Sequence, residues 1–274
     1  MADIVLTAGV RQNLLQLQQT SALITATQTK LATGKRVNSA LDNPINYFTA
    51  QGLSNRASDL SNLLDSMSTA FNTIQAANNG ITSITKLVQS AQALASQAQQ
   101  TSDTTIRAGL ATQFDAILTQ IDKLAGDSSF NGINLLDSTN STDLTVTLNE
   151  SGSSSVTITA VDFTTGGDLA VGGANNNWAT TADIGLATAD LTAALTTLRS
   201  QAQAFGSNLS TVQIRQDFTK SMVNTLQTGA DALTLADSNE EGANLLALQT
   251  RQQLSTTALS LASQASQAVL RLFQ

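Results

Sequence analysis

The sequence LSNLLDSMSTAFNTIQAANNGITSITKLV at residues 60–88 repeats a large apolar side chain every three or four positions for much of its length. The series consists of Leu60, Leu64, Met67, Phe71, Ile74, Ile81 and Val88. This spacing brings the side chains to one face of an α-helix. A pattern that continues for so many turns is typical of a bundle or coiled-coil helix, because the helices of compact domains are much shorter.

Four further stretches repeat this spacing and predict other long helices. They lie within residues 10–31, 110–124, 191–233 and 254–272. Aromatic residues make up only 4% of the chain, so its interior must be built from Leu, Ile, Val and Ala. Such interiors suit helical bundles better than thick globular cores. We therefore predict a mainly α fold of the long-helix coiled-coil or bundle type.

Capping residues predict where the helices begin and end. Asn43 precedes the only proline, Pro44, and the two suit the N-cap and the first position of a helix. We therefore expect a break in the helices near residues 35–44. The pair Ser102–Asp103 is expected to cap the third helix, and Gly126 is expected to end it.

Residues 126–183 differ from the rest of the chain, because they are rich in Gly, Ser, Thr, Asn and Asp. Two runs inside this segment, residues 144–148 and 156–160, alternate apolar and polar side chains. Turn-forming residues 150–153 separate these runs, which predicts a small β-hairpin. The hairpin lies in the middle of the chain, so the N- and C-terminal helical arms are expected to pack together.

These patterns predict three parts. Residues 1–42 and 235–274 form a domain of paired terminal helices, and residues 43–136 and 184–234 form a helical bundle. Residues 137–183 form the hairpin and a variable surface region.

The apolar stripes have two interpretations, the core of one chain or a seam between chains. We favour the core for the middle helices. For the terminal arms we favour the seam, because one pair of long arms cannot cover its own apolar surface. The candidate packing residues of the arms are Val10, Leu14, Leu17, Ile24, Leu31, Leu254, Leu261 and Leu272.

Composition argues against several classes of function. The chain has no His and no Cys, so it lacks the commonest catalytic bases, thiol nucleophiles and zinc ligands; we expect no enzyme activity, metal or cofactor. Its net charge is −7 and its 13 Lys and Arg are scattered, which argues against nucleic acid and anionic membranes as partners. No apolar run reaches the roughly 18 residues of a membrane span, and the first residues do not resemble a secretory signal peptide.

Weak motif matches favour structural interpretations. Gly34–Lys35 resembles the end of a phosphate-binding loop, but Thr29 and Arg36 stand where that motif needs Gly and Ser or Thr, so we expect a basic turn. Residues 237–248 imitate a calcium loop, but Leu248 replaces its bidentate Glu, so we expect an acidic turn that begins a helix. Carboxylates outside the stripes are expected on solvated helix faces rather than in a glycosidase pair. These are Asp59, Asp65, Asp115 and Asp122.

Three motifs resemble those of bacterial flagellins. LATGKRVNSALDNP at residues 31–44 resembles the N-terminal signature of the family, and SFNGINLL at residues 129–136 resembles the loop after its third helix. QASQAVLRLF at residues 264–273 resembles its C-terminal tail. The resemblance covers both helical arms, residues 1–136 and 184–274. It implies a structural subunit that polymerises into the flagellar filament used for swimming, in a short form without large outer domains.

The resemblance also implies partners and a location. The partners are other copies of the chain, an export chaperone that binds the C-terminal stripe, the filament cap and the hook–filament junction proteins, with no nucleic acid and no membrane insertion. The subunit leaves through the flagellar export apparatus without a cleaved signal peptide and forms an extracellular filament. Its terminal arms are expected to be disordered in the free subunit and helical in the filament. Two alternatives stay open: a hook–filament junction protein of the same superfamily, and a coiled-coil surface adhesin.

Two surface sites follow from the resemblance. The family's immune-receptor patch falls on residues 89–97, where Ser90 replaces the Arg of the family and Leu94 keeps the apolar contact, so we expect weak recognition. O-glycosylation is expected on exposed hydroxyls between Ser138 and Thr181. The candidates are Ser138, Thr139, Ser141, Thr142, Ser153 and Ser154.

Overall fold

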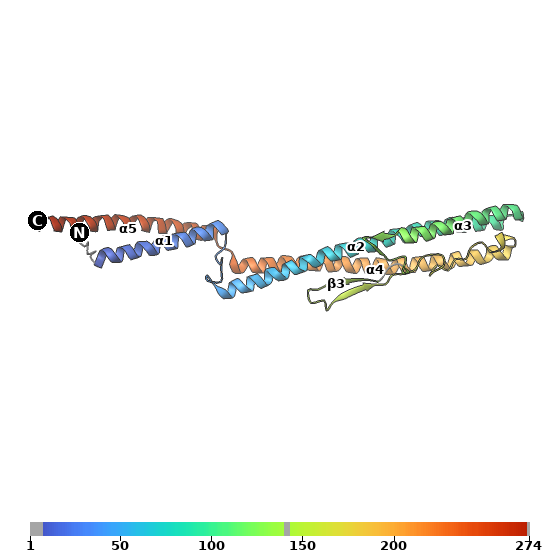
Figure 1. Cartoon of the computed structure of the whole chain (residues 1–274), viewed down its shortest axis with the longest axis horizontal. Helices are drawn as coiled ribbons and strands as arrows, with labels where there is room; N and C mark the ends of the chain where they lie inside the picture. The colour runs from blue at the N-terminus through green and yellow to red at the C-terminus, as the bar shows by residue number, and fades with distance from the viewer. Residues whose placement is uncertain (1–7, 140–142, 273–274) are drawn as a thin grey trace. The chain divides into compact units, whose positions relative to one another are not determined.

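The computed structural model describes residues 8–139 and 143–272 and is built mainly from long α-helices (Figure 1). The helices are α1 (Ala8–Thr33), α2 (Pro44–Gln99), α3 (Thr104–Asp127), α4 (Thr181–Thr234) and α5 (Ser238–Leu272). The predicted mainly α class is confirmed. The apolar spacing within residues 191–233 belongs to the single continuous helix α4.

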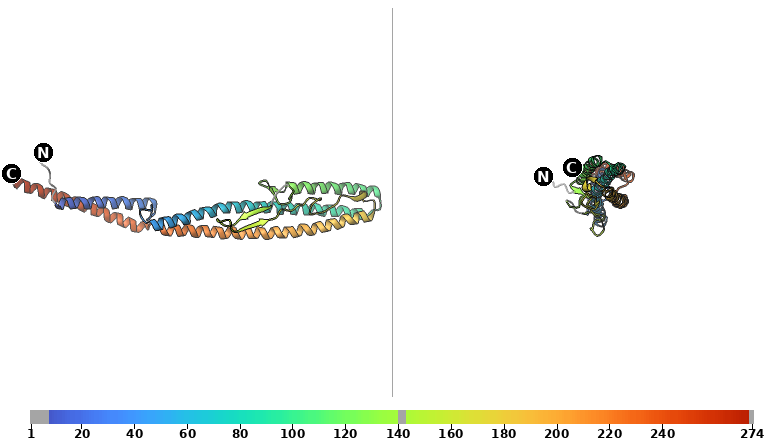
Figure 2. Two further views of the ribbon diagram at one scale, coloured as in Figure 1. Left: turned by 60° about the horizontal axis from the view of Figure 1, so that its bottom comes forward. Right: turned by 90° about the vertical axis from the view of Figure 1, so that its right-hand side faces the viewer.

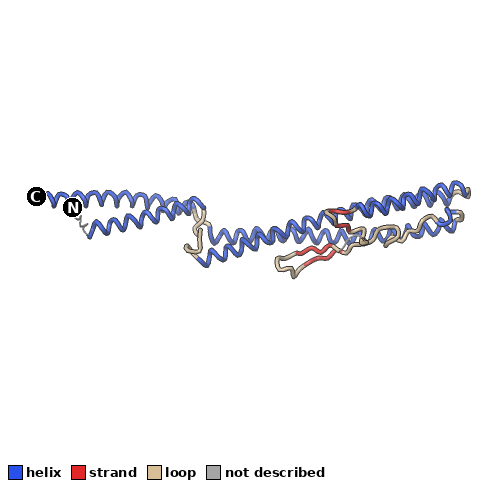
Figure 3. The backbone as a smooth tube through the Cα atoms, viewed as in Figure 1, coloured by secondary structure: helices blue, strands red, loops and turns tan. Residues whose placement is uncertain are grey.

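Two small antiparallel sheets lie between α3 and α4 in the sequence (Figure 3). Strands β3 (Leu144–Thr147) and β4 (Ser155–Ile158) pair with Leu144 opposite Ile158, which confirms the predicted hairpin. Strands β1 (Ser129–Phe130) and β2 (Ile133–Asn134) form a second sheet that we did not predict. Strands of two residues are too short to show an alternating pattern.

The chain divides into two compact units. The terminal unit comprises Met1–Asn55 and Thr225–Gln274, and the bundle unit comprises Arg56–Asn224. Both boundaries fall inside long helices, α2 and α4. Apolar periodicity alone could not locate such boundaries, since it continues across them.

Polar side chains fix the helix ends. The side-chain oxygen of Asn43 accepts the N–H of Asn46 at 3.0 Å, and α2 begins at Pro44, as predicted. Asp103 caps α3, as predicted, by accepting the N–H of Thr105 at 2.8 Å. The prediction that Gly126 ends α3 is wrong, because the helix continues to Asp127.

The end of α3 needs no glycine because Asn134 satisfies its carbonyl groups. The side-chain amide of Asn134 donates to the carbonyl oxygens of Ala125 at 2.7 Å and Gly126 at 2.9 Å. The hydroxyl of Ser128 donates to the carbonyl of Leu124 at 2.6 Å. A left-handed glycine commonly serves this purpose at helix ends, and here a buried side chain replaces it.

The bundle unit buries the apolar face of α2 from Met67 to Val88 in a core to which α3, α4 and the segment between them contribute (Figure 2). Met67, Ile74 and Val88 are completely buried. The face continues as small residues, Ala91 and Ala95, which are also completely buried and allow close helix packing. α3 and α4 contribute larger side chains to the same core. These are Leu110, Phe114, Leu118 and Ile121 from α3 and Ile184, Leu191, Leu195, Leu198, Phe205 and Val212 from α4.

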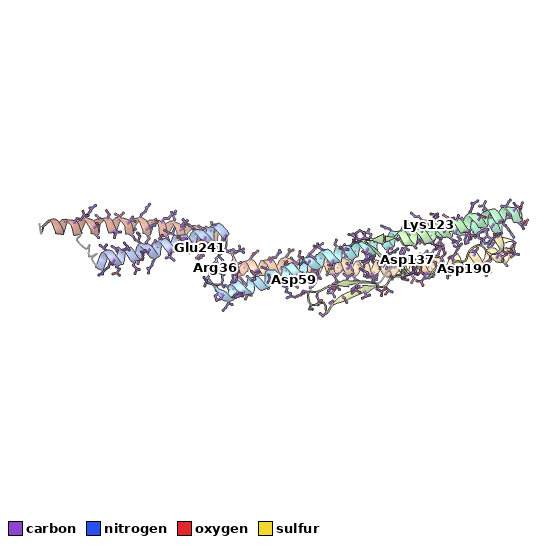
Figure 4. All side chains as sticks on the ribbon, viewed as in Figure 1. Arg36, Asp59, Lys123, Asp137, Asp190 and Glu241 are labelled. Atoms are coloured by element: carbon purple, nitrogen blue, oxygen red, sulfur yellow. The ribbon has the colours of Figure 1, made fainter. Side chains whose placement is uncertain are left out.

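Of the four carboxylates predicted on solvated helix faces, Asp59, Asp65 and Asp115 are exposed and Asp122 is half-buried. Asp59 and Asp65 lie on exposed faces of α2, as predicted (Asp59 is labelled in Figure 4). Asp115 accepts the N–H of Ala174 at 2.8 Å, and Asp122 accepts the N–H of Thr165 at 2.6 Å. Both carboxylates therefore hold the irregular segment after β4 against α3 by supplying acceptors for its backbone.

The same segment and the α2–α3 turn are fixed by buried side chains. Trp178, in the short 3₁₀ helix η1 (Asn175–Trp178), packs against Phe114 with ring centroids 4.9 Å apart. The buried guanidinium of Arg107 donates to the carbonyl oxygens of Thr101 at 2.7 Å and Ala179 at 3.3 Å. Arg107 thus ties the end of α2 to the residues that precede α4.

Gly80 is predicted to be essential for the packing of α2 against the chain that follows α3. A Cβ at this position would lie 2.6 Å from Cδ1 of the buried Leu136, and closer still to the hydroxyl of Ser128. We expect Gly80→Ala to lower the free energy of unfolding by about 1–3 kcal/mol through overpacking. Urea denaturation measures this change.

The matched control for Gly80→Ala is Gly109→Ala. Gly109 is also inside a helix, α3, but it is exposed and a Cβ there meets nothing within 4 Å. Its replacement should stabilise the protein by about 1 kcal/mol, because Ala is the better helix former. Equal effects of the two substitutions would contradict the packing role of Gly80.

Candidate assembly surface

The terminal unit is centred on α1 and α5, which lie side by side (Figures 1 and 2). The ammonium of Lys30 near the end of α1 lies 2.9 Å from a carboxylate oxygen of Glu241 in the first turn of α5 (Glu241 is labelled in Figure 4). Asp237 caps α5 by accepting the N–H of Asn239 at 2.8 Å. The predicted acidic turn that begins a helix is therefore confirmed.

The contact between α1 and α5 buries few apolar side chains. On α1 the buried side chains are Thr20, Ile24 and Thr27. Among the described side chains of α5, Glu241 alone is classed as buried. Burial of threonine and a charged carboxylate contributes much less to stability than burial of leucine or isoleucine. The helix pair is therefore weakly stabilised by its own contacts.

Several large apolar side chains of the pair are exposed, whereas others, such as Leu245 and Leu248, are half-buried. Leu254 is 67% exposed, Leu261 62% and Leu246 69% on α5, whereas Leu23 on α1 is 51% exposed. A surface of this kind, with several leucines on both helices, is typical of an interaction site.

The predicted packing residues of the arms divide into four groups. Ile24 is buried in the pair, and Leu14, Leu254 and Leu261 are exposed. The others on α1 are half-buried, namely Val10, Leu17 and Leu31. The side chain of Leu272 lies outside the described residues.

The segment between α1 and α2 is bound to the junction of α4 and α5. The N–H groups of Arg36 and Val37 donate to the carbonyl of Thr234 at 2.7 and 3.2 Å, and the N–H of Ala236 donates to the carbonyl of Gly34 at 3.0 Å. Gly34 ends α1 with a φ of 68°, a conformation that favours glycine. Lys35 and Arg36 are exposed here, which confirms the predicted basic turn.

Asp42 organises the rest of this loop. One of its carboxylate oxygens accepts the N–H groups of Asn38 and Ser39, both at 2.9 Å. The hydrogen bonds from the backbone of Asn38 and then of Ser39 lower the pKa of the Asp42 carboxyl below its ordinary value. A carboxylate therefore holds the loop in its turn.

Next to Asp42 the chain presents three exposed apolar side chains, which we call the loop patch. Leu41 is 96% exposed, Ile45 77% and Phe48 64%. The sequence pattern does not predict this patch, because its residues span a loop and the start of a helix and follow no sustained period. The only sequence feature that could have predicted the patch is the occurrence of Leu41, Ile45 and Phe48 close to Pro44, where a helix was expected to begin.

The two surface sites inferred from the resemblance lie on the bundle unit. Ser90 is exposed and its hydroxyl donates to the carbonyl of Lys86 at 3.0 Å, whereas Leu94 is half-buried and packs against the core. Of the candidate glycosylation sites, Ser138, Thr139 and Ser153 are exposed and Ser154 is half-buried. Ser141 and Thr142 lie outside the described residues.

Residues 8–139 and 143–272 contain no group of three or more His, Cys, Asp or Glu arranged to hold a metal ion. Within the same ranges no helix is long and apolar enough to cross a membrane. The described residues therefore define a mainly helical protein with one helical bundle and one pair of long terminal helices that leaves several leucines exposed.

Comparisons with known proteins identify the family. The model of the bacterial flagellin N-terminal helical region matches residues 7–141, and that of the C-terminal helical region matches residues 182–273. Flagellin FljM of Caulobacter vibrioides is 32% identical over 268 residues, and flagellin FljK of the same organism is 31% identical over 274 residues. Each of these alignments covers 97% of both chains. The chain belongs to the bacterial flagellin family and is a structural subunit of the flagellar filament, which serves motility.

Two other similarities are partial. Flagellin A of Rhizobium meliloti is 43% identical over 82 residues, which are 30% of this chain and 21% of that protein. The crystal structure of Bacillus cereus flagellin is 23% identical, covers 58% of this chain and 88% of its own, and superposes with a TM-score of 0.48.

The lowered pKa of Asp42 predicts a pH-dependent loop. Because the pKa is lower in the folded loop than its ordinary value of 3.8, the carboxylate stabilises the loop fully at pH values above 3.8. This stabilisation is lost as the pH falls through the lowered pKa. Hydrogen exchange at the amides of Asn38 and Ser39, measured against pH, should show this loss.

Asp42→Asn should remove most of this pH dependence, because a neutral amide oxygen accepts hydrogen bonds less strongly than a carboxylate. The protection of the two amides in the variant should be lower than in the parent above pH 3.8, and the difference should shrink below it. Asp59→Asn is the control, since Asp59 is exposed on α2. A difference that persists at the lowest pH would contradict the role of Asp42.

Proposed function

We propose that this flagellin polymerises mainly through its terminal unit, with the exposed leucines of α1 and α5 buried against neighbouring subunits. The observation that carries the proposal is the contrast between the two helices' buried and exposed side chains. Glu241 is buried on α5, whereas Leu246, Leu254 and Leu261 are 62–69% exposed. A head-to-tail contact gives an open-ended filament when the rotation between subunits does not close a ring.

The energetics support coupling between folding and assembly. Ordering each residue of an arm costs about 1–2 kcal/mol of backbone entropy. Complete burial of a leucine contributes about 1.5–3 kcal/mol, but the isolated pair leaves most of its leucines in water. We propose that the arms are marginally stable in the free subunit and become stable helices only when neighbours cover them.

The loop patch extends the proposed assembly surface. Leu41, Ile45 and Phe48 are presented by a loop that hydrogen bonds to the α4–α5 junction, so their position depends on both ends of the chain. We propose that this patch packs against a neighbouring subunit together with the leucines of the arms. A correctly folded terminal unit would then be required for contact at the patch.

Other parts of the function are proposed from family membership. The filament lies outside the cell; we propose that the subunit reaches it through the flagellar export apparatus without a cleaved signal peptide. We propose that an export chaperone binds the exposed leucines of α5 before assembly, and that the filament cap and the junction proteins contact the subunit in the filament. The family is structural, and we propose that the chain has no enzymatic role, cofactor or metal.

Two further proposals concern the surface of the bundle unit, namely binding by the innate immune receptor and attachment of glycans. We propose weak binding by the innate immune receptor, because the small hydroxyl of Ser90 stands at a position where the family presents an Arg. Glycan attachment is proposed at exposed hydroxyls of the segment between α3 and α4, with Ser138, Thr139 and Ser153 as the exposed candidates.

Leu254→Asp tests the assembly surface. A charge at a site that becomes buried should raise the critical concentration for polymerisation by about tenfold to a hundredfold, the equivalent of one lost leucine burial. Seeded assembly followed by sedimentation and electron microscopy measures this concentration. Leu261→Asp should have a similar effect.

The matched control is Leu254→Met, which keeps an apolar side chain of similar volume and should polymerise almost normally. Urea denaturation of the monomers should show unchanged stability of the bundle unit in all three variants, because residue 254 and residue 261 belong to the terminal unit. Normal polymerisation of both Asp variants would refute an assembly surface on α5.

A further inference from the structure

The turn between β1 and β2 presents an Asn-Gly pair to solvent. Phe130 and Ile133 face each other across the sheet, so Asn131 and Gly132 are the two residues of the turn. Their φ angles are 50° and 80°, and positive φ at both positions is the mark of a type I′ turn. Both residues are exposed.

We infer that Asn131 is a site of spontaneous deamidation. The backbone nitrogen of Gly132 attacks the side-chain carbonyl carbon of Asn131, a C–N bond forms, and ammonia leaves, which closes a five-membered succinimide ring. Water then adds to either ring carbonyl and breaks the C–N bond there. The product is Asp or isoaspartate at position 131, with one carboxyl group in place of the amide.

Gly132 favours this reaction because it has no Cβ. A side chain on the attacking residue would crowd the forming ring, and no atom lies within 4 Å of the place where a Cβ of Gly132 would stand. In the part of the chain that the structure describes, neither the Asn131 amide nor the Gly132 N–H has a hydrogen bond that would restrain it.

The chain contains the same dipeptide at Asn79–Gly80, where the structure prevents the reaction. Gly80 is buried inside α2, and a residue in the interior of a helix donates its N–H to the carbonyl four positions earlier. Rotation of the backbone at Asn79 would break the helix where Gly80 packs closely against Leu136. Asn79 therefore reacts only when the bundle unit opens.

A third pair with a small second residue, Asn38–Ser39, is restrained at both reacting groups. The side-chain amide of Asn38 donates to the carbonyl of Lys35 at 2.9 Å, and the N–H of Ser39 donates to Asp42 at 2.9 Å. The loop must lose both hydrogen bonds before ring closure. Asn140–Ser141 lies outside the described residues.

Reaction at Asn131 requires only a small opening. The backbone must rotate until the Gly132 nitrogen lies beside the side-chain carbonyl, which breaks the turn. Sheets of two strands are marginally stable by themselves, and each strand here has two residues. Asn134 stays bound to the end of α3 by its side chain during such an opening.

The modification has a structural consequence. Isoaspartate adds one methylene to the main chain, so a two-residue turn can no longer keep Phe130 opposite Ile133. Either product adds a negative charge at an exposed position beside the α3 terminus. Deamidation would therefore accumulate with the age of a subunit and loosen the β1–β2 sheet while leaving the core of the bundle unit in place.

The chain contains both the test site, Asn131–Gly132, and its control, Asn79–Gly80, so both can be measured in the same sample. The purified full-length chain is incubated at mildly alkaline pH, native and in urea, then digested and analysed by mass spectrometry, with enzymatic methyl labelling of isoaspartate. In urea Asn79 and Asn131 should convert at similar rates. In the native protein Asn131 should convert at least about tenfold faster than Asn79, because local opening is far more frequent than unfolding of the bundle unit.

Two native results would overturn the inference. One is conversion of Asn79 as fast as that of Asn131, which would place the reaction in the unfolded chain. The other is an intact Asn131 after the sample in urea has converted at both sites, which would mean that the turn does not open. Asn131→Gln assigns the modified residue, since a six-membered ring closes much more slowly and the label at this peptide should disappear.

Discussion

The burial of one face of α2 in a core shared with α3, α4 and the segment between them is the interaction on which the bundle unit depends. Met67, Ile74 and Val88 are fully enclosed, and the same face continues as Ala91 and Ala95. Large side chains supply most of the burial energy, and the small ones allow close packing. The irregular segment after β4 adds Phe163 and Trp178 to this core, while Asp115 and Asp122 satisfy its backbone.

The terminal unit buries far fewer large apolar side chains than the bundle unit, and this difference supports the proposal that neighbouring subunits cover it. α1 buries two threonines and one isoleucine, and the described part of α5 buries a glutamate that pairs with Lys30. An exposed ion pair adds little stability, and a partly buried pair such as this one fixes the alignment of the helices. The exposed leucines are the side chains that we propose neighbouring subunits cover.

Several features could be predicted because they depend on neighbouring residues in the chain. Asn43 and Asp103 cap helices through bonds to N–H groups two or three positions away. The β3–β4 hairpin follows from alternation over a few residues and a polar turn. The prediction that Gly126 ends α3 was wrong because Asn134, eight positions further along the chain, satisfies the carbonyl groups at the helix end.

The sequence alone determined that long amphipathic helices form, because periodicity is a property of the chain itself. Tertiary structure decided which apolar faces are covered. Val88 and Leu254 occupy similar positions in their helical patterns, yet one is completely buried and the other is 67% exposed. It also decided that Asp115 and Asp122 bind a backbone segment while Asp59 faces solvent. A helical period identifies a face, but only the packed neighbours determine whether that face meets a core, a distant loop or water.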